Sequence, residues 1–191
     1  MRRQHDEPTS NLDNENALNW KNEIKSFIDM CGDDNELKSY WYAFYNDISE
    51  LPSGSNYCGM IQNDPHMENI LIHDDELYLI DFDVSNYHFF ASDIAVAIQS
   101  VLFTLSGGME RPVKNKEALL RFVSYMLKGY YKECEMPNDA LNTIDLFISY
   151  RRLLLFTVMQ DWLKTKPDML NSWKKMVIEK PPVFELIRKR M

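Results

Sequence analysis

The sequence predicts a mainly α-helical fold with one small β-hairpin, an α+β arrangement, as a single domain over residues 1–191. Three observations predict it. Apolar residues recur at helical spacing through most of the chain. One central stretch instead contains two short β-type runs around a turn. The chain is 45% hydrophobic, so its length suffices to bury a sizeable core.

The first part of the chain, residues 1–59, is expected to be a helical lead-in. Two amphipathic helices are indicated by the following apolar positions: Leu18, Ile24, Phe27 and Ile28, then Leu37, Tyr40, Trp41, Phe44, Ile48 and Leu51. Pro52, Gly54 and Gly59 break the second pattern and predict a loop.

Residues 60–86 contain the predicted β element. Asn69–Ile72 and Leu77–Phe82 are short runs of apolar, β-branched and aromatic residues, and the letters HDDE separate them. This pattern predicts a hairpin whose turn lies at residues 73–76, with Asp74 and Asp75 as ordinary turn residues.

Oxygen-bearing side chains gather at one end of this hairpin. An antiparallel pair brings the start of its first strand beside the end of its second, so Asn69 and Asp81 should meet, with Asp64 in the adjoining loop. These donors suit Mg²⁺, which prefers one or two protein oxygens plus substrate phosphates. A polar surface hairpin is the alternative, since a lone Asp or Asn in a loop is most often a turn former or a cap.

Residues 87–191 are predicted to be helical. Ser92 and Asp93 could cap a helix that runs to about residue 105, where Gly107 and Gly108 would stop it. His88 is expected to pack in the core or a loop. A second helix should cover about residues 115–133.

The third helix of this part should run from about residue 138 to about residue 164. It is apolar on nearly every side between Leu146 and Leu163, so we expect it to form the buried axis of the core. Two shorter helices, separated by Pro181 and Pro182, should close the chain.

Composition narrows the function classes. The net charge of −8 argues against nucleic acid as a partner, because phosphate binding needs clustered Lys and Arg. Apolar runs are too short to cross a membrane. Cys31, Cys58 and Cys134 are odd in number and widely spaced, so they should be free thiols. These features predict a cytoplasmic protein with neither nucleic acid nor membrane as partner.

The central stretch resembles the aminoglycoside phosphotransferase and choline kinase family, which has the protein-kinase-like fold. That family's pattern runs roughly H-G-D-x-H-x-x-N-x-L, then I-D-F-D, then D-L-A, and the matching text here is QNDPHMENIL, LIDFD and SDIAVAI. The match is close from Met60 to about Val101. It implies O-phosphorylation of a small hydroxylated molecule by ATP or GTP with Mg²⁺.

The resemblance also assigns roles to individual residues. Asp64 falls on the catalytic position, which orients and deprotonates the substrate hydroxyl. The metal-binding positions correspond to Asn69 and Asp81, and Asp83 would be an auxiliary metal ligand or a substrate contact. Gln62 and His66 fall in the cofactor-binding part, where they would brace the metal and catalytic loops. Asp93 would be structural, as a helix cap or a loop anchor.

The sequence departs from the family pattern in two places. Gln62 and Asn63 replace the usual His-Gly; the Gln amide can supply the missing hydrogen bond, and Asn tolerates positive φ better than most residues. No GxGxxG, GxxxxGK[ST] or V-A-I-K lysine occurs. The chain is therefore expected to be a C-terminal lobe, with the N-terminal nucleotide lobe absent or separate.

Three partners follow from this expectation. They are a separate nucleotide lobe, a second copy of the chain in a homodimer, and a small hydroxylated substrate for which a cationic amine is one option. A lobe built to pack against another exposes apolar surface when alone. The alternative function is a truncated, non-catalytic remnant or binding module of the same fold.

Overall fold

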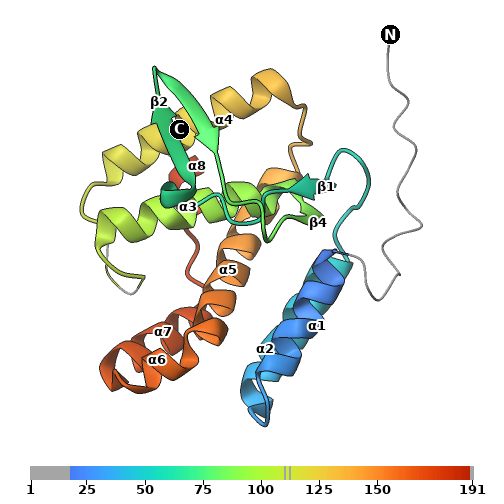
Figure 1. Cartoon of the computed structure of the whole chain (residues 1–191), viewed down its shortest axis with the longest axis vertical. Helices are drawn as coiled ribbons and strands as arrows, with labels where there is room; N and C mark the ends of the chain where they lie inside the picture. The colour runs from blue at the N-terminus through green and yellow to red at the C-terminus, as the bar shows by residue number, and fades with distance from the viewer. Residues whose placement is uncertain (1–17, 110, 112, 190–191) are drawn as a thin grey trace.

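The computed structural model describes residues 18–109, 111 and 113–189, and Figure 1 shows their arrangement. Helices dominate this part of the chain, with two small antiparallel sheets among them, so the predicted helical α+β class is confirmed. The elements are α1 (Trp20–Met30), α2 (Asn35–Ser49), β1 (Cys58–Ile61), the 3₁₀ helix η2 (Met67–Asn69), β2 (Ile70–His73), β3 (Glu76–Leu79), β4 (Asn86–Phe89), α3 (Phe90–Ser106), α4 (Lys116–Glu133), the 3₁₀ helix η3 (Ala140–Thr143), α5 (Ile144–Val158), α6 (Gln160–Lys164), α7 (Pro167–Glu179) and α8 (Phe184–Arg188).

Helices α1 and α2 pack side by side at one edge of the molecule (Figure 1). Each begins at a side-chain cap: Asn19 Oδ1 accepts from the Asn22 N–H at 3.0 Å, and Asp34 Oδ1 accepts from the Leu37 N–H at 2.9 Å. Both helices bury their apolar faces, as the spacing predicts. The part of the predicted lead-in before residue 18 lies outside the described residues.

Strands β2 and β3 form the predicted hairpin, in a register that pairs Ile70 with Leu79. Asp74 and Asp75 occupy its turn with φ of 49° and 61°, the two positive values that a tight two-residue turn requires. The second strand ends at Leu79, earlier than predicted. Asp81 has a φ of 58°, which an extended strand cannot contain, so the chain leaves the ladder before it.

A second sheet, formed by β1 and β4, has no counterpart in the sequence prediction. Cys58 pairs with Phe89 and Ile61 pairs with Asn86, so the expected loop gives way to a strand that includes Gly59. The two strands are far apart in sequence, and no turn between them signals their pairing. Their pairing holds the two ends of segment 62–85 together, and that segment carries the predicted site.

Helix α5 is the axis of the core, as its apolar sequence predicts. It packs against α1, α2, α3, α7 and α8. The single helix predicted over residues 138–164 is wrong, because the chain forms η3, α5 and α6 with a break at Met159. Thr157 Oγ1 donates to the Leu153 carbonyl at 2.8 Å and accepts from Trp41 Nε1 at 3.0 Å, and such back-bonding often bends a helix.

The other helix boundaries agree closely with the sequence. Gly107 ends α3 with a φ of 74°, which its lack of a side chain permits. Asn115 caps α4, and residues 181–182 separate α7 from α8. Cys31, Cys58 and Cys134 are free thiols, as predicted. Within the described ranges, none of the helices has the length and apolar character needed to cross a bilayer.

His88 lies in the core, as predicted, among the rings of Trp20, Phe147 and Tyr150. Its Nδ1 accepts from the Phe89 N–H at 2.7 Å, while Nε2 has no hydrogen-bond partner in the described part of the chain. Complete burial lowers the pKa of His88 to about 4, so the ring is neutral in the folded protein.

Acid should therefore destabilise the fold through His88. Below its ordinary pKa of 6.5 the unfolded chain binds a proton that the folded chain does not bind until about pH 4. This difference removes about 2 kcal/mol of unfolding free energy between pH 7 and pH 5. His88→Phe should lose less stability than the wild type over that interval in urea titrations. Equal losses in the two proteins would contradict the assignment.

Candidate active site

The loop that contains Asp64 is anchored to the first turn of α3 by Asp93. The Asp93 carboxylate accepts the backbone N–H groups of Gln62 at 3.1 Å and Asn63 at 2.8 Å. Burial raises the pKa of Asp93 to about 6, although the two backbone bonds lower it. Asp93 is thus a loop anchor. The predicted cap at Ser92 and Asp93 is wrong, because α3 begins at Phe90, its N-cap residue is Phe89, and no side chain caps it.

Gln62 connects this loop to the segment after β3. Its side-chain Nε2 donates to the carbonyls of Ile80 at 3.0 Å and Asp81 at 2.6 Å, and its Oε1 accepts the Asp64 N–H at 2.7 Å. The buried amide therefore uses both its donor and its acceptor. It fixes the separation of the two loops that carry Asp64 and Asp81.

Asn63 adopts a φ of 71°, a conformation for which Asn is better suited than most residues. Its side-chain Nδ2 donates to Glu23 Oε2 at 2.6 Å. Glu23 also accepts Asn86 Nδ2 at 2.7 Å and the Tyr150 hydroxyl at 2.6 Å. One carboxylate of α1 thereby joins the Asp64 loop, β4 and α5. Sequence reasoning missed Glu23, because an acid on an amphipathic helix gives no signal of such contacts.

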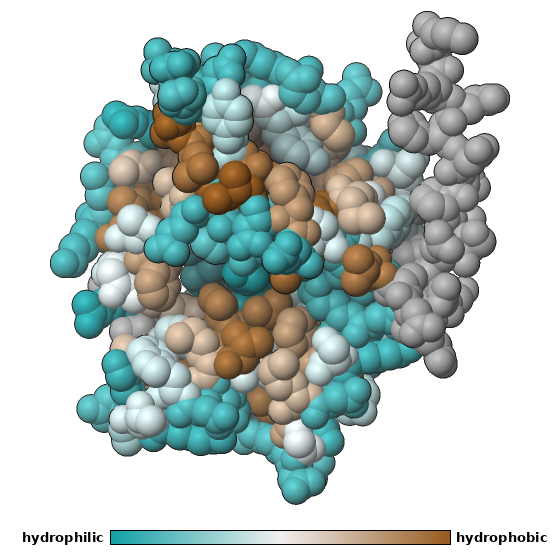
Figure 2. Space-filling model, in the orientation of Figure 1, coloured by the Kyte–Doolittle hydropathy of each residue, from teal (hydrophilic) through white to brown (hydrophobic). Residues whose placement is uncertain are grey.

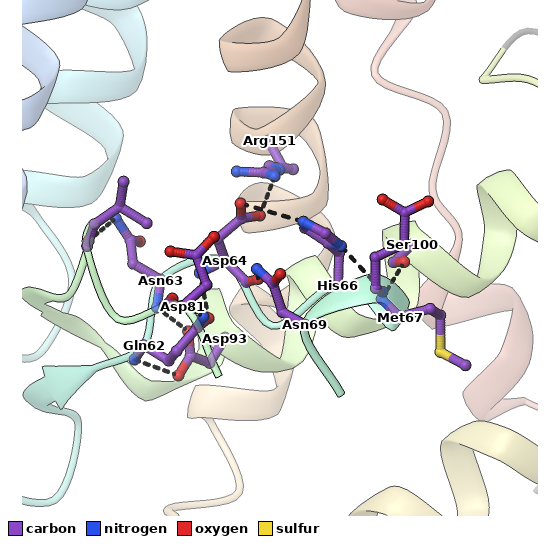
Figure 3. Close-up of polar contacts among 12 residues, drawn as sticks. Gln62, Asn63, Asp64, His66, Met67, Asn69, Asp81, Asp93, Ser100 and Arg151 are labelled. Atoms are coloured by element: carbon purple, nitrogen blue, oxygen red, sulfur yellow. Dashed lines mark hydrogen bonds and ion pairs between the residues drawn. The ribbon is translucent and has the colours of Figure 1, made fainter. Parts of the chain in front are cut away.

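Asp64 is half-buried, and its side chain points toward Arg151 of α5 (Figure 3). Its carboxylate forms an ion pair with Arg151 of α5, and His66 Nε2 lies 3.6 Å away. His66 Nδ1 accepts the Glu68 N–H at 3.2 Å, which caps η2. The sequence did not indicate Arg151, because it lies in a helix whose pattern predicts only core packing.

Asn69 and Asp81 lie on either side of the Asp64 segment in Figure 3. Asn69 Nδ2 donates to the Asp64 carbonyl at 3.0 Å, and the Ile80 N–H donates to the Asn69 carbonyl at 3.0 Å. Among the described residues, no hydrogen bond or ion pair engages Asn69 Oδ1 or the Asp81 carboxylate. Asp83 is exposed, two residues farther along, and is likewise without such a contact in the described chain.

The side-chain oxygens of Asn69 and Asp81 suit a hard divalent cation that a phosphate ligand also binds. A magnesium ion in a phosphotransferase takes one or two protein oxygens and completes its shell with phosphates and water. Asn69 and Asp81 can supply that number. No cluster of three or more His, Cys, Asp or Glu in the described residues could hold a metal by itself. The donor set therefore suits a cation that is shared with a phosphate ligand.

Asp64 also lines a cavity of about 450 Å³ between the loop, α3, α5 and α7. Phe103, Met159 and Trp162 are among the apolar residues of its wall. Its polar lining includes the following residues: Glu68, Gln99, Ser100, Thr104, Arg111 and Arg151. A pocket of this size and character is typical of a small-molecule site.

We compared the sequence and the fold with those of known proteins. No family model matches the chain. The chain shares the fold of the solved structure "Amicoumacin kinase hAmiN in complex with AMP-PNP, Ca2+ and Ami", which superposes with a TM-score of 0.75 at 24% identity, over 90% of this chain and 54% of that chain.

In sequence, the chain is homologous to amicoumacin kinase. It is 24% identical to the Bacillus subtilis (strain 168) enzyme over 173 residues, which are 86% of this chain and 50% of the relative. The chain thus spans about half the length of the relatives that it matches.

Proposed function

We propose that this chain is the C-terminal, acceptor-binding lobe of a small-molecule kinase that transfers a phosphoryl group from ATP or GTP to a hydroxyl group. One observation carries the proposal: the Asp64 carboxylate lines a cavity of about 450 Å³, while Asn69 and Asp81 present side-chain oxygens beside its loop. Homology to amicoumacin kinase supports the same class of substrate.

Asp64 is the proposed proton acceptor. An acceptor molecule in the cavity would place its hydroxyl against the carboxylate, which would remove the proton as the oxygen attacks the γ-phosphorus and the nucleoside diphosphate leaves. The ion pair with Arg151 holds the carboxylate toward the cavity. His66 and Gln62 keep the loop in place through their hydrogen bonds to residues 68, 80 and 81.

Asn69 and Asp81 are the proposed metal ligands, with Asp83 as an auxiliary ligand. A bound Mg²⁺ would offset the negative charge of the nucleotide phosphates. Gln62 sets the position of Asp81 by holding its carbonyl, and Asn69 is held by the Asp64 carbonyl. The two ligands are thus oriented by the same loop that carries the proton acceptor.

A nucleotide lobe is the proposed partner, and the β2–β3 hairpin is its proposed docking surface. Ile72 is 75% exposed and Leu77 is 72% exposed, and Leu71, Tyr78 and Phe82 are exposed as well. Figure 2 shows apolar side chains gathered over this hairpin. Exposed apolar patches mark interaction sites. Packing of a second copy on the same surface would instead give a homodimer.

Amicoumacin is the first acceptor to test, because the similar kinases carry its name. Glu68 lines the cavity and could accept a hydrogen bond from a cationic amine of the acceptor. The three free thiols favour a reducing compartment, and we place the proposed enzyme in the cytoplasm.

A non-catalytic binding module is the second candidate function. The observation that favours it is the ion pair that already engages Asp64 with Arg151. Such a module would bind the acceptor in the same cavity without transferring a phosphoryl group.

Metal-dependent nucleotide binding tests the proposed ligands. The chain is mixed with the part of amicoumacin kinase that it does not match, and AMP-PNP is titrated with and without Mg²⁺. We expect Asp81→Asn to weaken Mg²⁺-dependent binding by at least about tenfold, since one charged metal ligand is lost. Asp29→Asn is the matched control, because Asp29 is an exposed acid of α1 and belongs neither to the hairpin nor to the Asp64 cavity. Equal affinity in both variants would refute the assignment.

A further inference from the structure

A second cavity, of about 500 Å³, lies between α3, α4, α5 and the segment that leads into α8. It adjoins the Asp64 cavity, since Gln99, Phe103 and Arg111 line both. Asp64 does not line it, and its wall is mostly apolar, with Leu102, Leu119 and Ile187 among the buried contributors. The proposed phosphoryl transfer makes no use of this space.

One charged side chain of this cavity is deeply buried. Arg152 is only 3% exposed; its Nε donates to Gln99 Oε1 at 3.2 Å and its Nη1 donates to the Pro181 carbonyl at 3.1 Å. No described group accepts a hydrogen bond from Nη2, and no described carboxylate forms an ion pair with the guanidinium. Burial lowers the pKa of Arg152 to about 10, which still leaves it charged at neutral pH.

The charge of Asp145 raises the pKa of Arg152, but the Asp145 carboxylate accepts three backbone N–H groups at the start of α8. These come from residues 183, 184 and 185, at 2.6, 2.8 and 2.8 Å. The Asp145 carboxylate therefore fixes α8 and does not complete an ion pair with Arg152.

Burial of a guanidinium without an ion pair lowers the stability of the fold, and an apolar residue of similar volume would avoid that loss. The other charged residues that line the cavity are also cationic, namely Arg111 and Lys116, and no described Asp or Glu lines it. Arg152, buried in a mostly apolar wall without a described carboxylate partner, matches a ligand that brings one negative charge and an apolar body.

We propose that this cavity binds a small amphipathic carboxylate. Its carboxylate would accept from Arg152 Nη2, and its hydrocarbon part would lie against Leu102, Leu119 and Ile187. The site is separate from the proposed acceptor site, although Gln99 borders both.

Octanoate and octanol are the probes, titrated calorimetrically into the full 191-residue chain below the micellar range. We expect octanoate to saturate one site and octanol, which lacks the charge, to bind at least about tenfold more weakly. Arg152→Met should weaken octanoate binding by a similar factor. Arg151→Met is the matched control, because the neighbouring arginine lines only the Asp64 cavity, and it should keep wild-type affinity.

Three results would overturn the proposal. They are no saturable octanoate binding by the folded wild type, equal affinities for octanoate and octanol, and loss of octanoate binding in Arg151→Met with retention in Arg152→Met. The last result would place the anion in the Asp64 cavity. Circular dichroism checks that both variants fold, and the comparison of the two probes uses the wild type alone.

Discussion

Replacing Glu23 with alanine is expected to lower the free energy of unfolding by about 3 kcal/mol, because three donors lose a charged acceptor. The Tyr150 hydroxyl is buried, and burial beside Glu23 raises its pKa well above the ordinary value. The Asn63 and Asn86 amides, also buried, would lose their 2.6 Å and 2.7 Å bonds at the same time.

Urea unfolding of Glu23→Ala measures this effect. Asp29→Ala is the matched control, since Asp29 is an exposed acid on the same helix. Tyr150→Phe removes one of the three bonds and should cost about 1 kcal/mol. An unfolding midpoint of Glu23→Ala that equals that of Asp29→Ala would show that Glu23 does not join the elements as described.

Replacing Asp64 with asparagine is expected to lower the rate of phosphoryl transfer by about 10²–10⁴-fold, the usual contribution of a positioned proton acceptor. Asparagine keeps an oxygen that can accept from Arg151, so the loop should hold its shape while its base is lost. The acceptor affinity should change far less than the rate, because the cavity wall is otherwise intact.

The rate is measured by mass spectrometry of the phosphorylated acceptor, in the mixture with the complementary part of amicoumacin kinase. Asp29→Asn removes an exposed acid from α1, away from the hairpin, and should keep the wild-type rate. A wild-type rate in Asp64→Asn would exclude Asp64 as the proton acceptor.

Local patterns in the sequence anticipate much of the fold. The hairpin could be predicted because its strands and turn are contiguous, and its geometry brings Asn69 close to residue 80. The sequence also shows that Asp64 lies a few residues before Asn69, in the loop that leads into the hairpin. Helix ends at Gly107 and Asn115 follow from single residues with well-known preferences.

Contacts between distant segments could not be predicted in this way. Tyr150 and Glu23 are 127 residues apart, and Arg151 and Asp64 are 87 apart, and no periodic pattern encodes either pair. The β1–β4 pairing and the break after α5 depend on tertiary contacts of the same kind. The lobe assignment and the roles of individual site residues stay predictions.

Transfer of the γ-phosphoryl group of ATP to amicoumacin tests the central proposal most directly. The 191-residue chain, Mg²⁺ and the complementary part of amicoumacin kinase are combined, and the product is followed by mass spectrometry. We predict phosphorylated amicoumacin with the wild-type chain and its near-complete loss with Asp64→Asn. A wild-type mixture that binds both AMP-PNP and amicoumacin but forms no product would contradict a kinase and favour the binding module.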